Sequence, residues 1–212
     1  MLSYRKLAMR VLGRPLHTGG IDSPRPASQR AAALVLTAAM LTTLTAPAFA
    51  GTWYIEDGNI TVKASGTEGT NKVSQGANQE VEDTDTIITN RNEGTASSNT
   101  VTINAGNDKV EVTLEDVNIK SDSGSALTSK GDVTLTLKGD NSLTGGNGGS
   151  GISSSGSLTI SGGEKDSLTA QGGSGLSGIF SSGGVTISGG TVNANGGDGG
   201  GGDYSGGGSG IY

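Results

Sequence analysis

Apolar and small polar residues alternate in short runs along most of the chain, and two of these runs are nearly identical. Residues 158–163 read LTISGG, and residues 185–190 read VTISGG, 27 positions later. An alternating run that ends in glycine is typical of a half-buried strand followed by a turn. Because this unit recurs, the sequence predicts a repeat architecture.

The alternating runs align in three columns. They comprise residues 112–114, 135–137, 158–160 and 185–187; residues 117–119, 142–144, 167–170 and 191–194; and residues 126–129, 151–154, 178–181 and 210–212. Three short strands per period of roughly 23 to 32 residues predict an all-β fold, a right-handed parallel β-helix of about four to five coils. A β-sandwich is the main alternative, since it also contains strands at such spacing.

The columns predict which residues meet in neighbouring coils. Equivalent strands pair in parallel about 4.8 Å apart, so aligned Val, Ile and Leu side chains stack inside and Ser and Thr side chains outside. In this alignment Leu158 lies beside Leu135. Glycine pairs after the strands are expected to adopt positive φ at the corners. These pairs are residues 162–163, 172–173, 183–184, 189–190 and 196–197.

The first 50 residues have the features of a secretory signal peptide. Basic residues precede an apolar run at 31–44, and Ala48 and Ala50 occupy the −3 and −1 positions of a cleavage site. We therefore expect cleavage after Ala50 and an exported product, secreted or held at the cell surface. An uncleaved N-terminal anchor is the alternative. After cleavage no membrane span is expected.

Residues 51–212 are predicted to form one β-helix domain with atypical ends. Trp53 and Tyr54 are bulky, so we interpret residues 51–62 as an N-terminal cap; an aromatic platform for a sugar ring is the alternative. Residues 63–85 are expected to form a long polar loop. The third column restarts at 210–212, which suggests a fragment of a longer surface protein.

The polar loop contains an acidic cluster. Its members are Glu80, Glu82, Asp83 and Asp85. Such clusters are usually solvated, although carboxylate oxygens also bind hard cations such as calcium.

Composition narrows the functional classes. The chain has no cysteine, which excludes a disulfide-stapled domain. Residues 51–212 carry 19 acidic and 8 basic residues, a net charge of about −11. An acidic product without a basic patch is a poor candidate for nucleic-acid binding. Of the 39 glycines, 36 lie after residue 50, where they occur at fixed offsets from apolar pairs, and this favours ordered repeats over a flexible linker.

The sequence contains few groups suited to catalysis. The only histidine is His17 in the leader, and Arg91 is the only arginine after residue 50. Four carboxylates at turns are the candidates for a hydrolase site, and we expect them to lie apart from the corner that holds Asp166. They are Asp116, Asp122, Asp132 and Asp140. Without a positioned acid–base pair, we predict no catalytic residues and no enzyme activity.

Calcium is the one cofactor that the sequence suggests. Residues 196–204, which include Asp198 and Asp203, are similar to the Gly-rich nonapeptide that binds calcium in β-rolls. Gly201 stands where the second half of that motif needs Asp. A plain glycine corner loop is the alternative.

Several segments resemble a known family. Residues 51–62 (GTWYIEDGNITV), 88–91 (ITNR), 99–104 (NTVTIN) and 185–192 (VTISGGTV) are similar to Gly-rich β-helix repeat proteins exported by gut Firmicutes. These are adhesin-like or carbohydrate-binding-domain proteins of the pectin-lyase-like superfamily. Residues 151–156 (GISSSG) depart from the Gly-rich third column common in relatives.

The resemblance implies a surface module for adhesion or weak carbohydrate binding. Its expected partners are polysaccharides or host and cell-surface glycans, and some relatives bind acidic polysaccharide with calcium. Two alternatives stay open. One is a structural stalk without a ligand, which the uniform Ser, Thr and Asn surface also suits. The other is an inactive or fragmentary relative of polysaccharide lyases and hydrolases.

Overall fold

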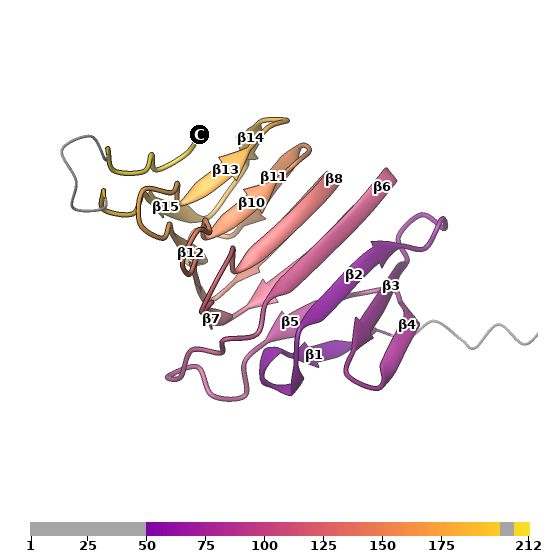
Figure 1. The fold of residues 1–212 in the computed structure, drawn as a ribbon. Coiled ribbons are helices and arrows are strands. Elements are labelled where there is room, and N and C mark those ends of the chain that lie inside the picture. The colour runs from indigo at the N-terminus through magenta and orange to yellow at the C-terminus, as the bar shows by residue number, and fades with distance from the viewer. Residues whose placement is uncertain (1–49, 200–205) are drawn as a thin grey trace, which may run out of the picture. The chain divides into compact units, whose positions relative to one another are not determined.

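The chain forms a parallel β-solenoid of about four turns, as the repeat predicts. The computed structural model describes residues 50–199 and 206–212 (Figure 1). The predicted signal peptide lies almost entirely outside these residues. In the part that is described, no helix is long and apolar enough to cross a membrane.

The strands form three faces, one for each predicted column. Face I contains β1 (Thr52–Tyr54), β5 (Ile87–Thr89), β11 (Leu158–Gly162), β14 (Val185–Ile187) and the last residues of β6 (Val101–Glu115) and β8 (Leu127–Lys138). Face II contains β2 (Ile60–Ala64), β10 (Ile152–Ser154), β13 (Ile179–Ser181) and the first residues of β6 and β8. Face III contains β7 (Asn118–Lys120), β9 (Asp140–Thr144), β12 (Ser167–Gln171) and β15 (Thr191–Asn195).

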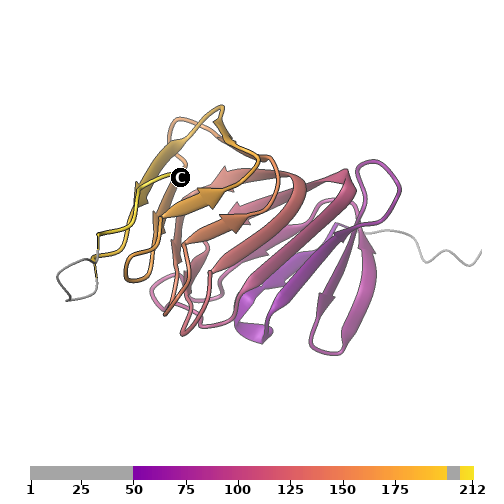
Figure 2. The same ribbon diagram turned by 45° about the horizontal axis from the view of Figure 1, so that its top comes forward.

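Faces I and II are continuous because β6 and β8 bend around the corner between them (Figure 2). The two faces therefore share one 11-stranded sheet, and face III is a separate four-stranded sheet. Gly106 and Gly131 adopt positive φ at the bend, where a side chain would be strained. In the later coils the strand is interrupted at this corner. One coil therefore has β10 and β11 in place of a single bent strand, and the next coil has β13 and β14.

The core consists of inward-facing Val, Ile and Leu side chains stacked between coils. The predicted third column is confirmed, because Leu127 pairs with Ile152, and Ile152 pairs with Ile179. An isolated parallel bridge between Ile179 and Ile211 continues it.

The predicted register of the first column is wrong by two residues at one step. Leu158 lies beside Val133, and Ile160 lies beside Leu135. A two-residue shift leaves every side chain on the same face, because successive side chains in a strand alternate. The alternating pattern alone therefore cannot distinguish the two registers.

The second column shows a similar shift, with Leu168 beside Asn141 and Ala170 beside Leu143. Asn141 occupies a buried position although it is polar. Its side chain accepts a hydrogen bond from the amide of Val117 at 3.0 Å and donates to carbonyl oxygens of Lys138 and Ser167. Because these bonds compensate its burial, an asparagine fits a core position here.

Most glycine pairs serve close packing and not positive φ, which corrects the prediction. Only Gly184 and Gly190 of the five predicted pairs have positive φ. At the corner between faces II and I, a Cβ added to Gly156 would lie 2.2 Å from the carbonyl oxygen of Gly131. One added to Gly183 would lie 2.5 Å from the carbonyl carbon of Gly156. Glycine is required because the coils approach each other directly at this corner.

The sequence suggested a long polar loop at residues 63–85, and this prediction is wrong. They contain β3 (Asn71–Gln75) and β4 (Asn78–Asp83), which extend face II as an antiparallel meander, β2–β3–β4. The inward positions of β3 include polar Asn71 and Gln75, whose amide groups donate to backbone carbonyl oxygens. The strand is stable in a polar sequence because these buried groups are hydrogen-bonded.

Candidate functional site

A groove of about 710 Å³ lies beside face I, where the β2–β3 turn approaches the corner of β6. The turn contributes residues 66–69 to its wall, and the segment between β4 and β5 contributes residues 84–86. Thr113 and Thr136, which are paired between β6 and β8, line it from the sheet. The groove is therefore built jointly by the solenoid and by the antiparallel extension.

Hydroxyl and carboxylate groups dominate the lining of the groove. The threonines are Thr67, Thr84, Thr86, Thr113 and Thr136. The carboxylates are Glu68, Asp85, Asp108, Glu111 and Asp132. Lys109 is the one basic residue in this lining. Such a surface can donate and accept hydrogen bonds, and its net negative charge disfavours an anionic ligand.

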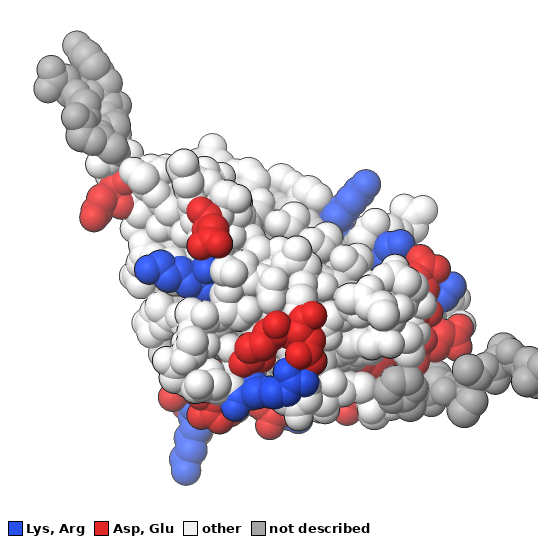
Figure 3. Space-filling view, turned by 60° about the horizontal axis from the view of Figure 1, so that its bottom comes forward, with Lys and Arg blue, Asp and Glu red and all other residues white. Residues whose placement is uncertain are grey.

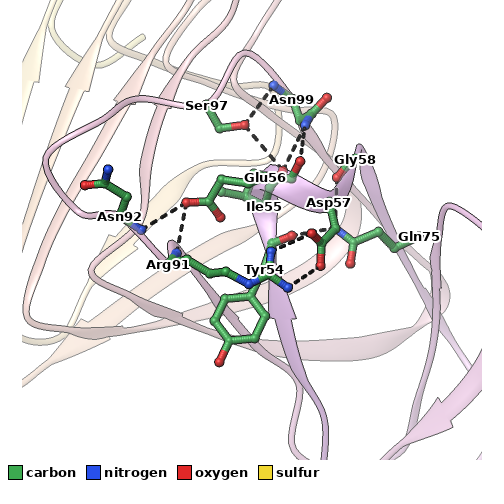
Figure 4. A network of polar contacts seen from close by, with 10 residues as sticks. All are labelled: Tyr54, Ile55, Glu56, Asp57, Gly58, Gln75, Arg91, Asn92, Ser97 and Asn99. Carbon is green, nitrogen blue, oxygen red and sulfur yellow. Dashed lines mark hydrogen bonds and ion pairs between the residues drawn. The ribbon is translucent and has the colours of Figure 1, made fainter.

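A second hollow, of about 440 Å³, lies at the N-terminal end of face I. Its lining includes Tyr54 of β1 and Arg91, which follows β5. The guanidinium carbon of Arg91 lies 4.1 Å from the centre of the Tyr54 ring, in cation–π geometry (Figure 4). The half-buried ring is thus held against a cation.

Arg91 is fixed by an acidic pair on the 3-10 helix η1 (Ile55–Asp57). Its guanidinium donates two hydrogen bonds to Asp57, at 2.5 and 2.6 Å. The amides of Arg91 and Asn92 both donate to one carboxylate oxygen of Glu56, at 2.9 and 3.2 Å (Figure 4). The hydrogen bond from Arg91 lowers the pKa of Asp57, and the same bond raises the pKa of Arg91. A guanidinium held in its charged form is unsuited to act as a base.

The turn carboxylates considered for hydrolysis bind backbone and hydroxyl groups. Asp116 accepts a hydrogen bond from the amide of Asp140 at 2.9 Å, and Asp140 accepts one from the hydroxyl of Ser167 at 2.7 Å. Asp166 accepts a bond from the amide of Gly139. The expectation that Asp166 lies apart from Asp116 and Asp140 is therefore wrong, since all three occupy one corner beside face III.

The other two turn carboxylates lie elsewhere. Asp132 lines the groove at face I. Asp122 is exposed in the turn after β7, and its backbone carbonyl accepts a bond from the amide of Asn147. The structure does not bring these two residues together with Asp116 and Asp140.

The acidic cluster of residues 80–85 is divided in the structure. Glu80 pairs with Lys63 at 2.9 Å, and the hydrogen bond from that lysine lowers the pKa of Glu80. Asp83 is completely buried and accepts a 2.7 Å bond from the indole N–H of Trp53. Trp53 is only 6% exposed, so its ring cannot serve as a platform for a sugar ring. Of the two aromatic residues, Tyr54 is the one that borders a hollow.

The suggested calcium residues are described only in part. Asp198 is exposed, and its backbone carbonyl accepts hydrogen bonds from the amide of Gly175 and the hydroxyl of Ser174. Asp203 lies outside the described residues. Within residues 50–199 and 206–212, no three His, Cys, Asp or Glu side chains gather as a metal site would require.

Sequence reasoning missed the groove because its wall is the unrecognised meander. A signal was present in residues 71–83, where Val73 and Val81 flank Gly76-Ala77, the two-residue spacing of a hairpin loop. The pairing of Arg91 with Asp57 spans 34 positions, and no local pattern encodes it.

No family model, curated protein or solved structure matches this chain. The molecule is therefore defined by its own geometry, as a parallel β-solenoid with a polar groove on one face.

Proposed function

We propose that the protein is an exported β-solenoid module that binds glycans through face I. The observation that carries this proposal is the 710 Å³ groove lined by threonine hydroxyls and carboxylates. Sugars present many hydroxyl groups, and these exchange hydrogen bonds with such side chains. The Tyr54 ring at the N-terminal end of the same face offers an apolar surface against which a sugar ring can pack.

The charge of the groove indicates the class of glycan. The lining contains five carboxylates and one lysine and is therefore negatively charged. A neutral or amino sugar suits such a groove better than a uronic acid polymer. Red and blue side chains are interspersed on the face shown in Figure 3, without an extended blue patch.

We propose binding without catalysis. Arg91 is committed to Asp57, while Asp116 and Asp140 accept hydrogen bonds from the protein itself. The relatives implied by the sequence, which are adhesin-like proteins, would use such a face for attachment to polysaccharide or host glycan.

The experiment is a glycan array probed with residues 51–212, with and without a chelator. The groove variant is Thr113→Val, and the matched control is Thr169→Val, a half-buried strand threonine on face III. Loss of one neutral hydrogen bond predicts about three- to tenfold weaker binding for Thr113→Val and no change for the control. Equal effects of the two variants would contradict binding at the groove.

A structural stalk is the second candidate, and face III favours it. Outward positions on this face are small and polar, as at Ser142, Thr169 and Asn193, which are aligned across three coils. A uniform surface of this kind suits a spacer. Failure of the array to detect any glycan would favour the stalk over the binding module.

A further inference from the structure

Asp83 is a buried carboxylate without a basic partner in the described structure. Its exposure is 0%, and the ion pairs found within residues 50–199 and 206–212 are those of Lys63 with Glu80 and Arg91 with Asp57. Its hydrogen-bond donors are neutral: the amide of Gly51 at 2.9 Å, the indole of Trp53 at 2.7 Å and the amide of Asp85 at 3.1 Å. A buried charge normally has a countercharge, because desolvation is costly.

The donor nitrogen of Gly51 is the atom that the expected cleavage would release. Ala50 is exposed and Gly51 is buried, so the chain enters the folded unit at this bond. The carbonyl of Gly51 is also fixed, because it accepts a 3.0 Å bond from the amide of Ile87. Position 51 is therefore anchored on both sides before β1 begins.

Only glycine fits this position. A Cβ added to Gly51 would lie 2.7 Å from an oxygen of Asp83 and 2.7 Å from the indole nitrogen of Trp53. The carboxylate oxygen of Asp83 and the indole nitrogen of Trp53 belong to buried side chains and are hydrogen-bonded to each other, so neither can move aside freely. The pocket thus accepts a bare backbone nitrogen and excludes a side chain.

We propose that removal of the leader between Ala50 and Gly51 creates an α-ammonium group that forms a buried ion pair with Asp83 and locks the N-terminal end of the solenoid. Cleavage replaces a neutral amide donor by a charged one at the same place. Hydrogen bonds to charged donors are stronger than those to neutral ones. One of the other ammonium hydrogens takes the place of the bond to exposed Ala50, where water can bind it. This inference rests on the expected cleavage site and is independent of glycan binding.

The test compares two chains, one beginning at Gly51 and one that keeps Ala50 in front of it. The described core is built from residues 53–194, so both chains contain it in full. At pH 6.5 we expect the Gly51 chain to melt about 3 °C or more higher. The α-amino group is charged below its ordinary pKa of about 7.7–8.0, and pairing raises that pKa. The stabilisation is therefore complete below about pH 7.7 and lost as the pH rises through the folded value.

Nearby ionisable groups are the same in both chains. They are Glu82 and Asp85 beside Asp83, Lys72 opposite Glu82 across β3 and β4, and Glu111 of β6, whose carbonyl binds Asn71. Their titration therefore cancels in the comparison. Asp83→Asn should abolish the gap in melting temperature, whereas Asp85→Asn, an exposed carboxylate two residues away, should preserve it.

Two further measurements test the ion pair even if the Asp83→Asn variant does not fold. Nuclear magnetic resonance of the Gly51 chain should give an α-amino pKa above 8.0. Intact mass of the full chain, exported by a secreting host, should identify Gly51 as the first residue. Equal melting temperatures at pH 6.5, an α-amino pKa in the ordinary range, or another N-terminus would each overturn the proposal.

Discussion

At the scale of single residues, polar side chains stabilise this solenoid where the repeat is irregular. Asn141 and Gln75 take inward positions and donate hydrogen bonds to backbone carbonyl oxygens. Asp116 and Asp166 bind backbone amides at one corner. The polar composition of residues 63–85 suggested a loop for Gln75, because the carbonyl groups that its amide binds belong to Tyr54 and Gly58, 21 and 17 positions earlier in the sequence.

Arg91 gives a prediction at this scale. Arg91→Ala removes the hydrogen bonds that lower the pKa of Asp57, so this pKa should rise toward its ordinary value of 3.8. Because the pKa of Asp57 is depressed in the fold, its stabilising effect is present above pH 3.8 and lost as the pH falls through the folded value. The advantage of the native chain over Arg91→Ala should therefore vanish in strong acid.

The measurement is the titration of the Asp57 carboxyl carbon by nuclear magnetic resonance. Lys63→Ala is the matched control, since it breaks the other exposed ion pair and should shift Glu80 alone. An unchanged Asp57 pKa in Arg91→Ala would show that the guanidinium does not hold this carboxylate in solution.

At the scale of elements, the alternation of apolar and polar residues predicted where the strands lie better than it predicted which residues pair between strands. The third column was aligned correctly because Leu127, Ile152 and Ile179 each follow a small residue and begin a strand. In the first column β8 offers three equivalent inward positions, Val133, Leu135 and Leu137, so the pattern allowed a shift of two residues. The length of the corner decides between these registers, and alternation carries no information about it.

The stack of corner glycines gives a prediction at this scale. Gly156→Ala should reduce the free energy of unfolding by about 1–3 kcal/mol, because the new methyl group would collide with the carbonyl oxygen of Gly131 in the preceding coil. Gly94→Ala is the control, since the one atom near its added Cβ is an Asn92 oxygen at 3.6 Å. Urea unfolding measures both variants. Equal losses would mean that the corner can open to admit a side chain.

At the scale of the whole molecule, the solenoid was predictable and the candidate site only in part. The repeat specified three faces and parallel stacking, because each coil must bury its apolar side against its neighbours. The groove arises where the non-repeating β3–β4 meander meets face I, so no period in the sequence encodes it. The candidate site therefore lies where the regular stack of coils is interrupted.

The regular part makes a prediction about how stability varies along the stack. In solenoids each coil contacts only its neighbours, so an inner coil has two interfaces and an end coil has one. Ile160 and Ile187 are paired on face I, in β11 and β14, yet Ile160 is 0% exposed and Ile187 is 45% exposed. Ile160→Ala should cost about 2–5 kcal/mol of unfolding free energy, whereas Ile187→Ala should cost below about 1 kcal/mol.

Urea unfolding of the two variants at equal protein concentration tests this difference. The substitutions are chemically identical and lie in one column, so any difference reports the covering of the coil and not the side chain. A large loss for Ile187→Ala would show that the outer surface of the last described coil is covered in solution. Dependence of that loss on protein concentration would then identify a second copy of the chain as the cover, because only association responds to concentration.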